Sequence, residues 1–133
     1  MKFISKDSKK FLGVSDNKVC LTETEYEWKQ LNLSEGYFNI VPLENDILCI
    51  TPLSIEDGKE LELKKIDPTN QSQLWKIEED YLINRLERTE GIKKMCIDVC
   101  CENKETGTYI IIYHKKNNGN LKNQQWDIKN EQN

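Results

Sequence analysis

Four side chains in the last third of the chain are of types that could together bind a ligand carrying several hydroxyl groups. Asp98 lies in the stretch CIDV, and Tyr113 ends the stretch YIIIY. Asn123 and Gln124 come just before Trp126. A carboxylate accepts strong hydrogen bonds, an amide both donates and accepts, and an aromatic ring covers an apolar surface. Each residue alone could equally be a solvated strand residue, a rim aromatic or a turn former.

Other kinds of chemistry have weaker candidates. His114 follows Tyr113 and is the only histidine. It could border the same site and make binding pH-sensitive, or simply be exposed. Since this histidine has no evident nucleophile beside it in the sequence, we expect no enzyme activity and no catalytic residue.

The five cysteines, an odd number, predict reduced thiols rather than a disulfide framework. The stretch CIDVCC raises zinc as an alternative, but one histidine and two adjacent cysteines do not readily form a four-ligand shell. We therefore expect no metal and no cofactor. Cys100 and Cys101 follow the Asp98 strand and should lie in the loop after it, as redox-sensitive or unremarkable thiols.

The elements that would position these residues occur three times along the chain. Trp28, Trp75 and Trp126 each open a short apolar stretch, and the last two end the motif Gln-x-Trp. Before each tryptophan come an opening apolar strand and two apolar-x-apolar triplets, whose period of two is typical of strands. The triplets are Leu12–Val14, Leu48–Ile50 and Ile97–Val99, followed by Val19–Leu21, Leu61–Leu63 and Ile110–Ile112.

This pattern predicts an all-β domain over residues 1–133 with repeats at about 1–35, 36–79 and 80–133. Each repeat would supply four short strands, packed around a pseudo-threefold axis with the tryptophans in the shared core. The stretch YLINRLERTEG could instead be helical. The equivalent stretch in the second repeat contains Pro42, which favours a strand and hairpin. The glutamine of Gln-x-Trp should bond to backbone groups in the adjoining turn.

Three repeats with Gln-x-Trp near their ends resemble the ricin B-type lectin family, over essentially the whole chain. The resemblance is strongest in the second and third repeats and implies a β-trefoil fold. It also implies a shallow site for sugars such as galactose or N-acetylgalactosamine. In that family an aspartate in a Cys-apolar-Asp-apolar strand, a later aromatic residue and an Asn-Gln pair form the site. Asp98, Tyr113, Asn123 and Gln124 match this pattern in the third repeat, and His114 adjoins it.

The other two repeats depart from the family pattern. By the triplet alignment, Cys49 and Lys64 take the aspartate and aromatic positions of the second repeat, with Ser72 before Gln73. In the first repeat these positions are Gly13 and Thr22, and Tyr26 replaces the glutamine. We therefore expect one competent site. In the third repeat Ile111 replaces a polar residue of some relatives, which leaves selectivity for galactose open, and Lys115 replaces a cysteine that some relatives pair in a disulfide.

Charge and hydropathy argue against two kinds of partner, nucleic acid and the interior of a membrane. The net charge is −4 with mixed signs, so nucleic acid is not expected as a partner. No apolar run approaches the length of a membrane span, which argues against membrane insertion. The stretch MKFISKDSKK lacks the apolar core of a secretory signal. We therefore expect a cytoplasmic protein, or a secreted one if a leader was removed.

Glycans are the expected partners, and a homodimer would raise the avidity of a single weak site. A protein-interaction module, such as a protease inhibitor or cytoskeletal binder with degenerate sugar sites, is the main alternative. A targeting subunit of a toxin or glycosidase is a third.

Overall fold

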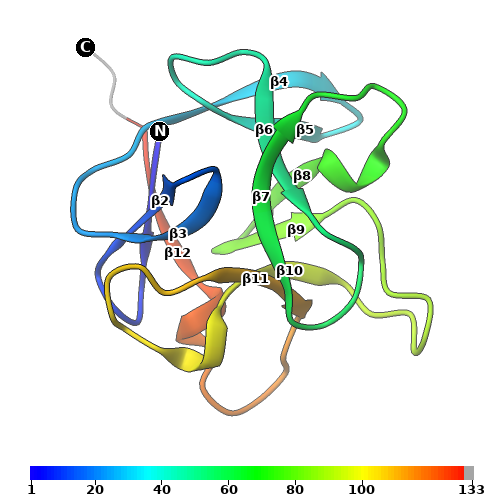
Figure 1. Ribbon diagram of the computed structural model, residues 1–133. Coiled ribbons are helices and arrows are strands. Elements are labelled where there is room, and N and C mark those ends of the chain that lie inside the picture. The colour runs from blue at the N-terminus through cyan, green and yellow to red at the C-terminus, as the bar shows by residue number, and fades with distance from the viewer. Residues whose placement is uncertain (131–133) are drawn as a thin grey trace.

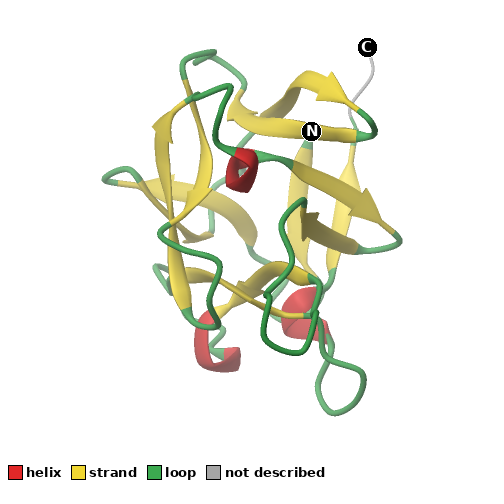
Figure 2. Cartoon of the chain, turned by 90° about the vertical axis from the view of Figure 1, so that its right-hand side faces the viewer, coloured by secondary structure: helices red, strands yellow, loops and turns green. Residues whose placement is uncertain are grey.

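The computed structural model describes residues 1–130, whose regular structure is almost entirely antiparallel strands. No described residue lies in an α-helix, so no helix of this part could span a membrane. Three single 3₁₀ turns, η1 (Gln71–Gln73), η2 (Cys100–Glu102) and η3 (Lys122–Gln124), lie in connections between strands (Figure 2). The strands are β1 (Lys2–Ser5), β2 (Phe11–Ser15), β3 (Lys18–Thr22), β4 (Trp28–Ser34), β5 (Tyr37–Pro42), β6 (Leu48–Pro52), β7 (Lys59–Lys65), β8 (Trp75–Glu78), β9 (Tyr81–Asn84), β10 (Met95–Val99), β11 (Ile110–His114) and β12 (Trp126–Lys129).

The first and last strands of each repeat form a closed barrel. Strand β1 pairs with β12, β4 with β5, and β8 with β9, so each of these ladders joins two repeats. Within each repeat the barrel closes through one contact at a tryptophan. Trp28 and Trp126 donate backbone hydrogen bonds to Met1 and Asp80, and Trp75 pairs with Phe38. Closure leaves little exposed strand edge.

The middle strands form three hairpins that meet one another at one end of the barrel. These hairpins are β2–β3, β6–β7 and β10–β11. Strand β7 pairs with both β3 and β11, and Cys20 of β3 forms a bridge with Tyr109 beside β11. The three hairpins surround the centre of the molecule when it is viewed down the pseudo-threefold axis (Figure 1). This barrel with a triangular cap is the β-trefoil fold that the resemblance to ricin B-type lectins implied, and its three units are those that the repeats predicted.

Equivalent tryptophans occupy equivalent places in the core. The indole N–H groups of Trp28, Trp75 and Trp126 donate to backbone carbonyls at 2.9, 3.1 and 3.2 Å, on β2, β6 and β10 respectively. All three side chains are fully buried. Each hydrogen bond satisfies a polar atom that would otherwise be costly to bury, and each ties the barrel to the cap.

The structure also decides between the two interpretations of YLINRLERTEG. Residues 81–84 form strand β9, and the bridge between Arg88 and Lys93 makes the following residues a hairpin rather than a helix. Four strands fall within each of the ranges 1–35, 36–79 and 80–133. The last three residues of the third range, 131–133, lie outside the described residues.

Candidate functional site

Asp98 lies near the end of β10, on the face of the β10–β11 hairpin that also carries Ile111 and Tyr113. Asp98 pairs directly with Ile111 across the ladder, and side chains two residues apart on a strand share a face. The hairpin therefore places a carboxylate and an aromatic ring on one side. Alternation along two strands is enough to bring the two predicted residues together.

A surface hollow of about 360 Å³ opens beside these side chains. It lies between the β10–β11 hairpin, the turns η2 and η3, and the β6–β7 turn of the second repeat. Asp98, Tyr113 and Asn123 all line it, as the sequence analysis expected of a common site. The remaining lining residues are Gly58, Val99, Cys100, Cys101, Glu102, Ile111 and Lys116.

Two amides hold the Asp98 carboxylate, which is only 3% exposed. The Asn123 amide donates to one oxygen at 2.6 Å, and the Gln124 amide donates to the other at 3.0 Å. Both donors come from η3, which the chain reaches just before Trp126. Each oxygen keeps a further lone pair, so the fixed carboxylate can still accept hydrogen bonds from a ligand.

Gln124 acts behind the hollow rather than in it, because its side chain is fully buried. Besides Asp98, its amide N–H₂ donates to the carbonyl of His114 at 2.8 Å, and its oxygen accepts from the Lys116 N–H at 3.0 Å. These bonds to the adjoining turn confirm the backbone role expected for the glutamine. Gln124, expected among the sugar-binding residues, does not line the hollow: its buried amide positions Asp98.

Lys116 is a lining residue that the sequence analysis did not find. Its ammonium donates to the Asn123 side-chain oxygen at 3.0 Å and lies 3.5 Å from a Glu102 carboxylate oxygen. Lys116 thus orients Asn123 so that the Asn123 amide donates to Asp98. The repeat pattern could not have identified Lys116, because the equivalent residue of the second repeat, Asp67, is of a different type.

The burial of Asp98 raises the pKa of its carboxyl to about 6. Desolvation is the main cause, because a buried carboxylate loses its hydration. The amide donors and the Lys116 charge oppose this effect without cancelling it. Asp98 is therefore largely ionised at neutral pH and becomes protonated in mildly acidic solution.

His114 lies beside the hollow but does not line it. Its ring stacks on Tyr113 with centroids 4.6 Å apart, and its Nδ1 lies 2.8 Å from an Asp57 carboxylate oxygen. Asp57 also accepts from the His114 N–H at 2.9 Å and from Arg88 at 2.5 Å. Burial raises the pKa of Asp57, but these hydrogen bonds and charges outweigh it, and the net pKa is lowered. His114 thus packs against Tyr113 and is itself held by Asp57.

The second repeat contains the same framework but no carboxylate, and it corrects one position of the sequence alignment. Gln73 donates to Thr51 at 3.2 Å and to the Lys65 carbonyl at 2.9 Å, as Gln124 does to Asp98 and the His114 carbonyl. Thr51, and not Cys49, is therefore the counterpart of Asp98. The triplet alignment was two residues out of register because apolar residues recur at every second position of both strands, so a shift by two keeps the pattern. The true counterpart of Cys49 is Cys96, as the tryptophan bonds to Ile50 and Ile97 show.

In the first repeat the Asp98 position is filled from the neighbouring strand. A Cβ atom on Gly13 would lie 2.5 Å from the Thr22 hydroxyl oxygen and 2.6 Å from its methyl carbon. Thr22 therefore occupies the space that a side chain would need. Tyr26 takes the place of the glutamine and packs on Trp28, with ring centroids 4.7 Å apart. This repeat cannot form the third-repeat arrangement.

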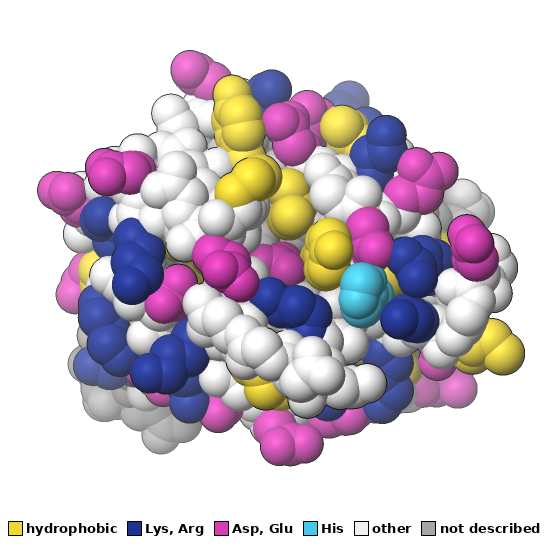
Figure 3. All heavy atoms as spheres, turned by 90° about the horizontal axis from the view of Figure 1, so that it is seen from below, with side chains coloured by type: hydrophobic (Ala, Val, Ile, Leu, Met, Phe, Trp, Pro, Cys, Tyr) yellow, Lys and Arg dark blue, Asp and Glu magenta, His cyan; other side chains and the backbone are white. Residues whose placement is uncertain are grey.

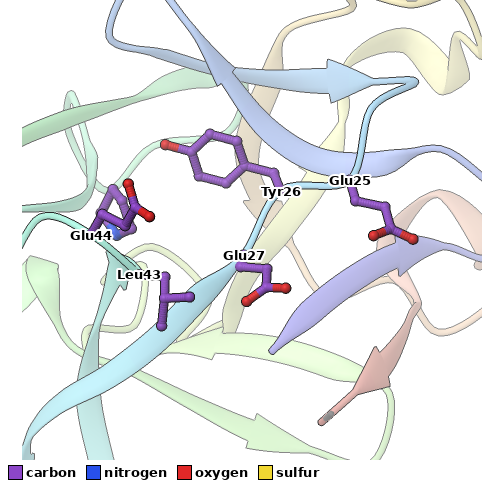
Figure 4. Close-up of a pocket in the computed structure, with 6 residues that line it drawn as sticks. Glu25, Tyr26, Glu27, Leu43 and Glu44 are labelled. Atoms are coloured by element: carbon purple, nitrogen blue, oxygen red, sulfur yellow. The ribbon is translucent and has the colours of Figure 1, made fainter.

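Another hollow, of about 420 Å³, lies beside Tyr26 (Figure 4). Its polar side chains are Glu25, Glu27 and Glu44, which are all exposed. Lys2 pairs with Glu25 at 2.8 Å and lies 3.9 Å from Glu27. Unlike Asp98, these carboxylates are not fixed by buried amides. The hollow thus lacks the preorganisation of the third-repeat site.

Cys100 and Cys101 lie in η2 and line the Asp98 hollow. Their sulfur atoms are 3.3 Å apart, and all five cysteines are free thiols. Among residues 1–130, no group of three or more His, Cys, Asp or Glu side chains is placed to hold a metal ion.

Comparison with solved structures identifies proteins of the same fold. A designed threefold-symmetric protein, ThreeFoil, matches with a TM-score of 0.68 and 19% sequence identity, over 94% of each chain. The C-terminal half of an earthworm R-type lectin, solved in complex with GalNAc, matches with a TM-score of 0.71 and 17% identity, over 98% of this chain and 97% of that one. No protein-family model matches the chain, and no curated protein matches its sequence. The resemblance to ricin B-type lectins is thus confirmed at the level of the fold: the chain is a β-trefoil.

Proposed function

We propose that this protein is a carbohydrate-binding lectin whose single competent site is the third-repeat hollow. The observation that carries the proposal is the Asp98 carboxylate, held by two amides beside the Tyr113 ring. The carboxylate would accept hydrogen bonds from two neighbouring sugar hydroxyls, and Tyr113 would cover the apolar C–H face of the ring. Asn123 would fix the orientation of one hydroxyl.

Galactose and N-acetylgalactosamine are the sugars we propose to test first. The similar fold of an R-type lectin solved with GalNAc supports this choice. A single shallow site of this kind would bind a monosaccharide with a dissociation constant of about 1 mM, which corresponds to a binding free energy of about −4 kcal/mol. Higher avidity would then require a dimer or clustered glycans.

Calorimetric titration of galactose, N-acetylgalactosamine and lactose into the wild type tests the proposal. The Asp98→Ala variant should lose binding. Thr51→Ala removes the equivalent side chain of the second repeat, and it should bind like the wild type. Circular dichroism and thermal melts establish that both variants are folded.

Saturable binding that disappears only in Asp98→Ala supports the lectin function. Absence of heat up to tens of millimolar sugar in the folded wild type, followed by a blank glycan array, contradicts it. Equal loss of binding in Asp98→Ala and Thr51→Ala would place the sugar elsewhere or reflect a general loss of stability.

A further inference from the structure

A second hollow adjoins the Asp98 hollow and shares two residues with it. This neighbour has a volume of about 310 Å³, and Tyr113 and Lys116 line both. Its other lining residues are Lys93, His114, Lys115, Asn117 and Asn118. A ligand bound against Tyr113 could therefore extend from one hollow into the other without leaving the surface.

The shared border separates two hollows of different charge. Lys93, Lys115 and Lys116 line the second hollow, and none of its lining residues is acidic. The whole chain carries a net charge of −4, so this local excess of ammonium groups opposes the overall charge. Figure 3 places the histidine of this face (cyan) directly beside Lys and Arg side chains (dark blue). We call Lys93, Lys115 and Lys116, with the hollow they line, the lysine hollow.

The acidic groups near the lysine hollow already have partners. Asp57 binds His114 and Arg88, at 2.8 and 2.5 Å. Glu102 lies 3.5 Å from Lys116, on the side of the Asp98 hollow. The Lys115 ammonium lies 4.5 Å from the centroid of the Tyr81 ring, and no carboxylate within residues 1–130 pairs with Lys93 or Lys115 in an ion pair. Their charges are therefore not neutralised locally.

We propose that the lysine hollow binds the anionic group of an acidic glycan whose terminal sugar ring occupies the Asp98 hollow. The anion would be a carboxylate or a sulfate ester, and this proposal rests on the lectin function proposed above. Lys93 approaches from the β9–β10 hairpin, and Lys115 and Lys116 approach from the segment after β11. Asn117 and Asn118 add amide groups that can donate to the remaining anion oxygens.

Calorimetry with matched neutral and acidic sugars tests this specificity. Lactose, lactose sulfated on its galactose and lactose carrying sialic acid on its galactose are titrated at low and at high salt. We expect at least one acidic sugar to bind about tenfold more tightly than lactose at low ionic strength, because the exposed Lys93 and the half-buried Lys115 act together. High salt should remove most of this preference. The two acidic sugars distinguish a sulfate from a carboxylate as the preferred anion.

Substitutions separate the lysine hollow from the Asp98 hollow. Lys93→Gln and Lys115→Gln should each weaken binding of the acidic sugar by about threefold and leave lactose binding unchanged. Lys93→Arg keeps the charge and should restore the preference. Lys64→Gln removes an exposed lysine at the position of Tyr113 in the second repeat, and it serves as the matched control.

Each outcome has a different meaning. Equal affinities for lactose and both acidic sugars at low salt would overturn the acidic-glycan proposal and leave the lectin function intact. An acidic preference that Lys93→Gln and Lys64→Gln reduce equally would also overturn it, since the effect would then be one of net charge. If Lys93→Gln weakens binding of the acidic sugars and Asp98→Ala does not, the result supports the anion site in the lysine hollow. The same result contradicts the proposed role of Asp98 in binding the sugar ring. If no sugar binds, both proposals fail.

Discussion

The side-chain amide of Asn123 donates a 2.6 Å hydrogen bond to the buried carboxylate of Asp98, and the Lys116 ammonium donates to the oxygen of the same amide. The three side chains form one chain of hydrogen bonds from the surface to β10. Asp98 is thereby held in one orientation before any ligand arrives. Such preorganisation reduces the entropy lost on binding.

Removal of the Asn123 amide should weaken both folding and sugar binding. Asn123→Ala leaves one Asp98 oxygen without its donor, and loss of a buried hydrogen bond to a charged group costs about 1–3 kcal/mol. Ser72→Ala, the equivalent change in the second repeat, should cost less because Ser72 has no carboxylate partner. Urea denaturation measures the unfolding free energy of each variant. Equal destabilisation by the two substitutions would show that the hydrogen bond from Asn123 to Asp98 contributes no extra stability.

Gln124 and Gln73 should both contribute to stability, and Gln124 should contribute more because it also donates to the buried Asp98 carboxylate, whereas Gln73 donates to the Thr51 hydroxyl. Only Gln124 should affect binding. Each bonds a backbone carbonyl and a backbone N–H in its turn, so either alanine substitution should destabilise the fold by about 1–3 kcal/mol. Only Gln124 also holds Asp98. Gln124→Ala should therefore lower the affinity for sugar, whereas Gln73→Ala should not. Thermal melts and calorimetry on the same samples separate the two effects.

The titration of Asp98 should make folding stability depend on pH in a defined direction. Burial raises the pKa from 3.8 to about 6, so the folded state binds a proton more tightly than the unfolded state. This contribution is fully present below pH ~4 and is lost as the pH rises through about 6. Its size is at most about 3 kcal/mol. Measured from pH 4 to 8, the difference in unfolding free energy between wild type and Asp98→Asn should show this slope, and a flat difference would contradict it.

Sugar binding should show the opposite pH dependence. Only the ionised Asp98 carboxylate can accept hydrogen bonds at both oxygens, so affinity should decrease as the pH falls through about 6. Well below this pKa, the affinity for sugar should fall by about tenfold for each pH unit. Because the His114 ring stacks on Tyr113 at the edge of the site, His114→Gln provides the control and should keep the decrease. If the pH dependence disappears in His114→Gln, the histidine rather than Asp98 controls binding.

The five thiols should differ sharply in reactivity. Cys101 is exposed, whereas Cys20, Cys49 and Cys96 are buried in the fold. Burial raises the pKa of the Cys49 thiol to about 11, and the pKa of Cys100 to about 11 with a contribution from neighbouring Cys101. Thiolates are the reactive form, so a maleimide should label Cys101 first. Peptide mass mapping after brief labelling checks this, and early labelling of Cys49 would indicate that β6 opens locally.

The sequence by itself determined the class of fold and the place of the candidate site within it. Period-two triplets, turn residues and the three tryptophans each act locally, so their spacing was sufficient to predict three repeats of four strands. Pro42 favoured a strand over a helix in the second repeat and, by equivalence, at YLINRLERTEG, and the structure confirms that prediction. Asp98, Tyr113 and Asn123 were grouped because they match the site pattern of the lectin family that the sequence resembles.

Only the tertiary structure decided which side chains face the hollow and which lie behind it. Gln124 and Asn123 are neighbours in the chain, yet η3 turns Gln124 into the core and Asn123 toward the hollow. Thr51 rather than Cys49 matches Asp98, because hydrogen bonds to Gln73 define the correspondence and apolar periodicity does not. Lys116 and the lysine hollow depend on contacts between segments distant in sequence, such as Lys93 and Lys115. Such proximity arises when β10 pairs with β11, and no local pattern in the sequence records it.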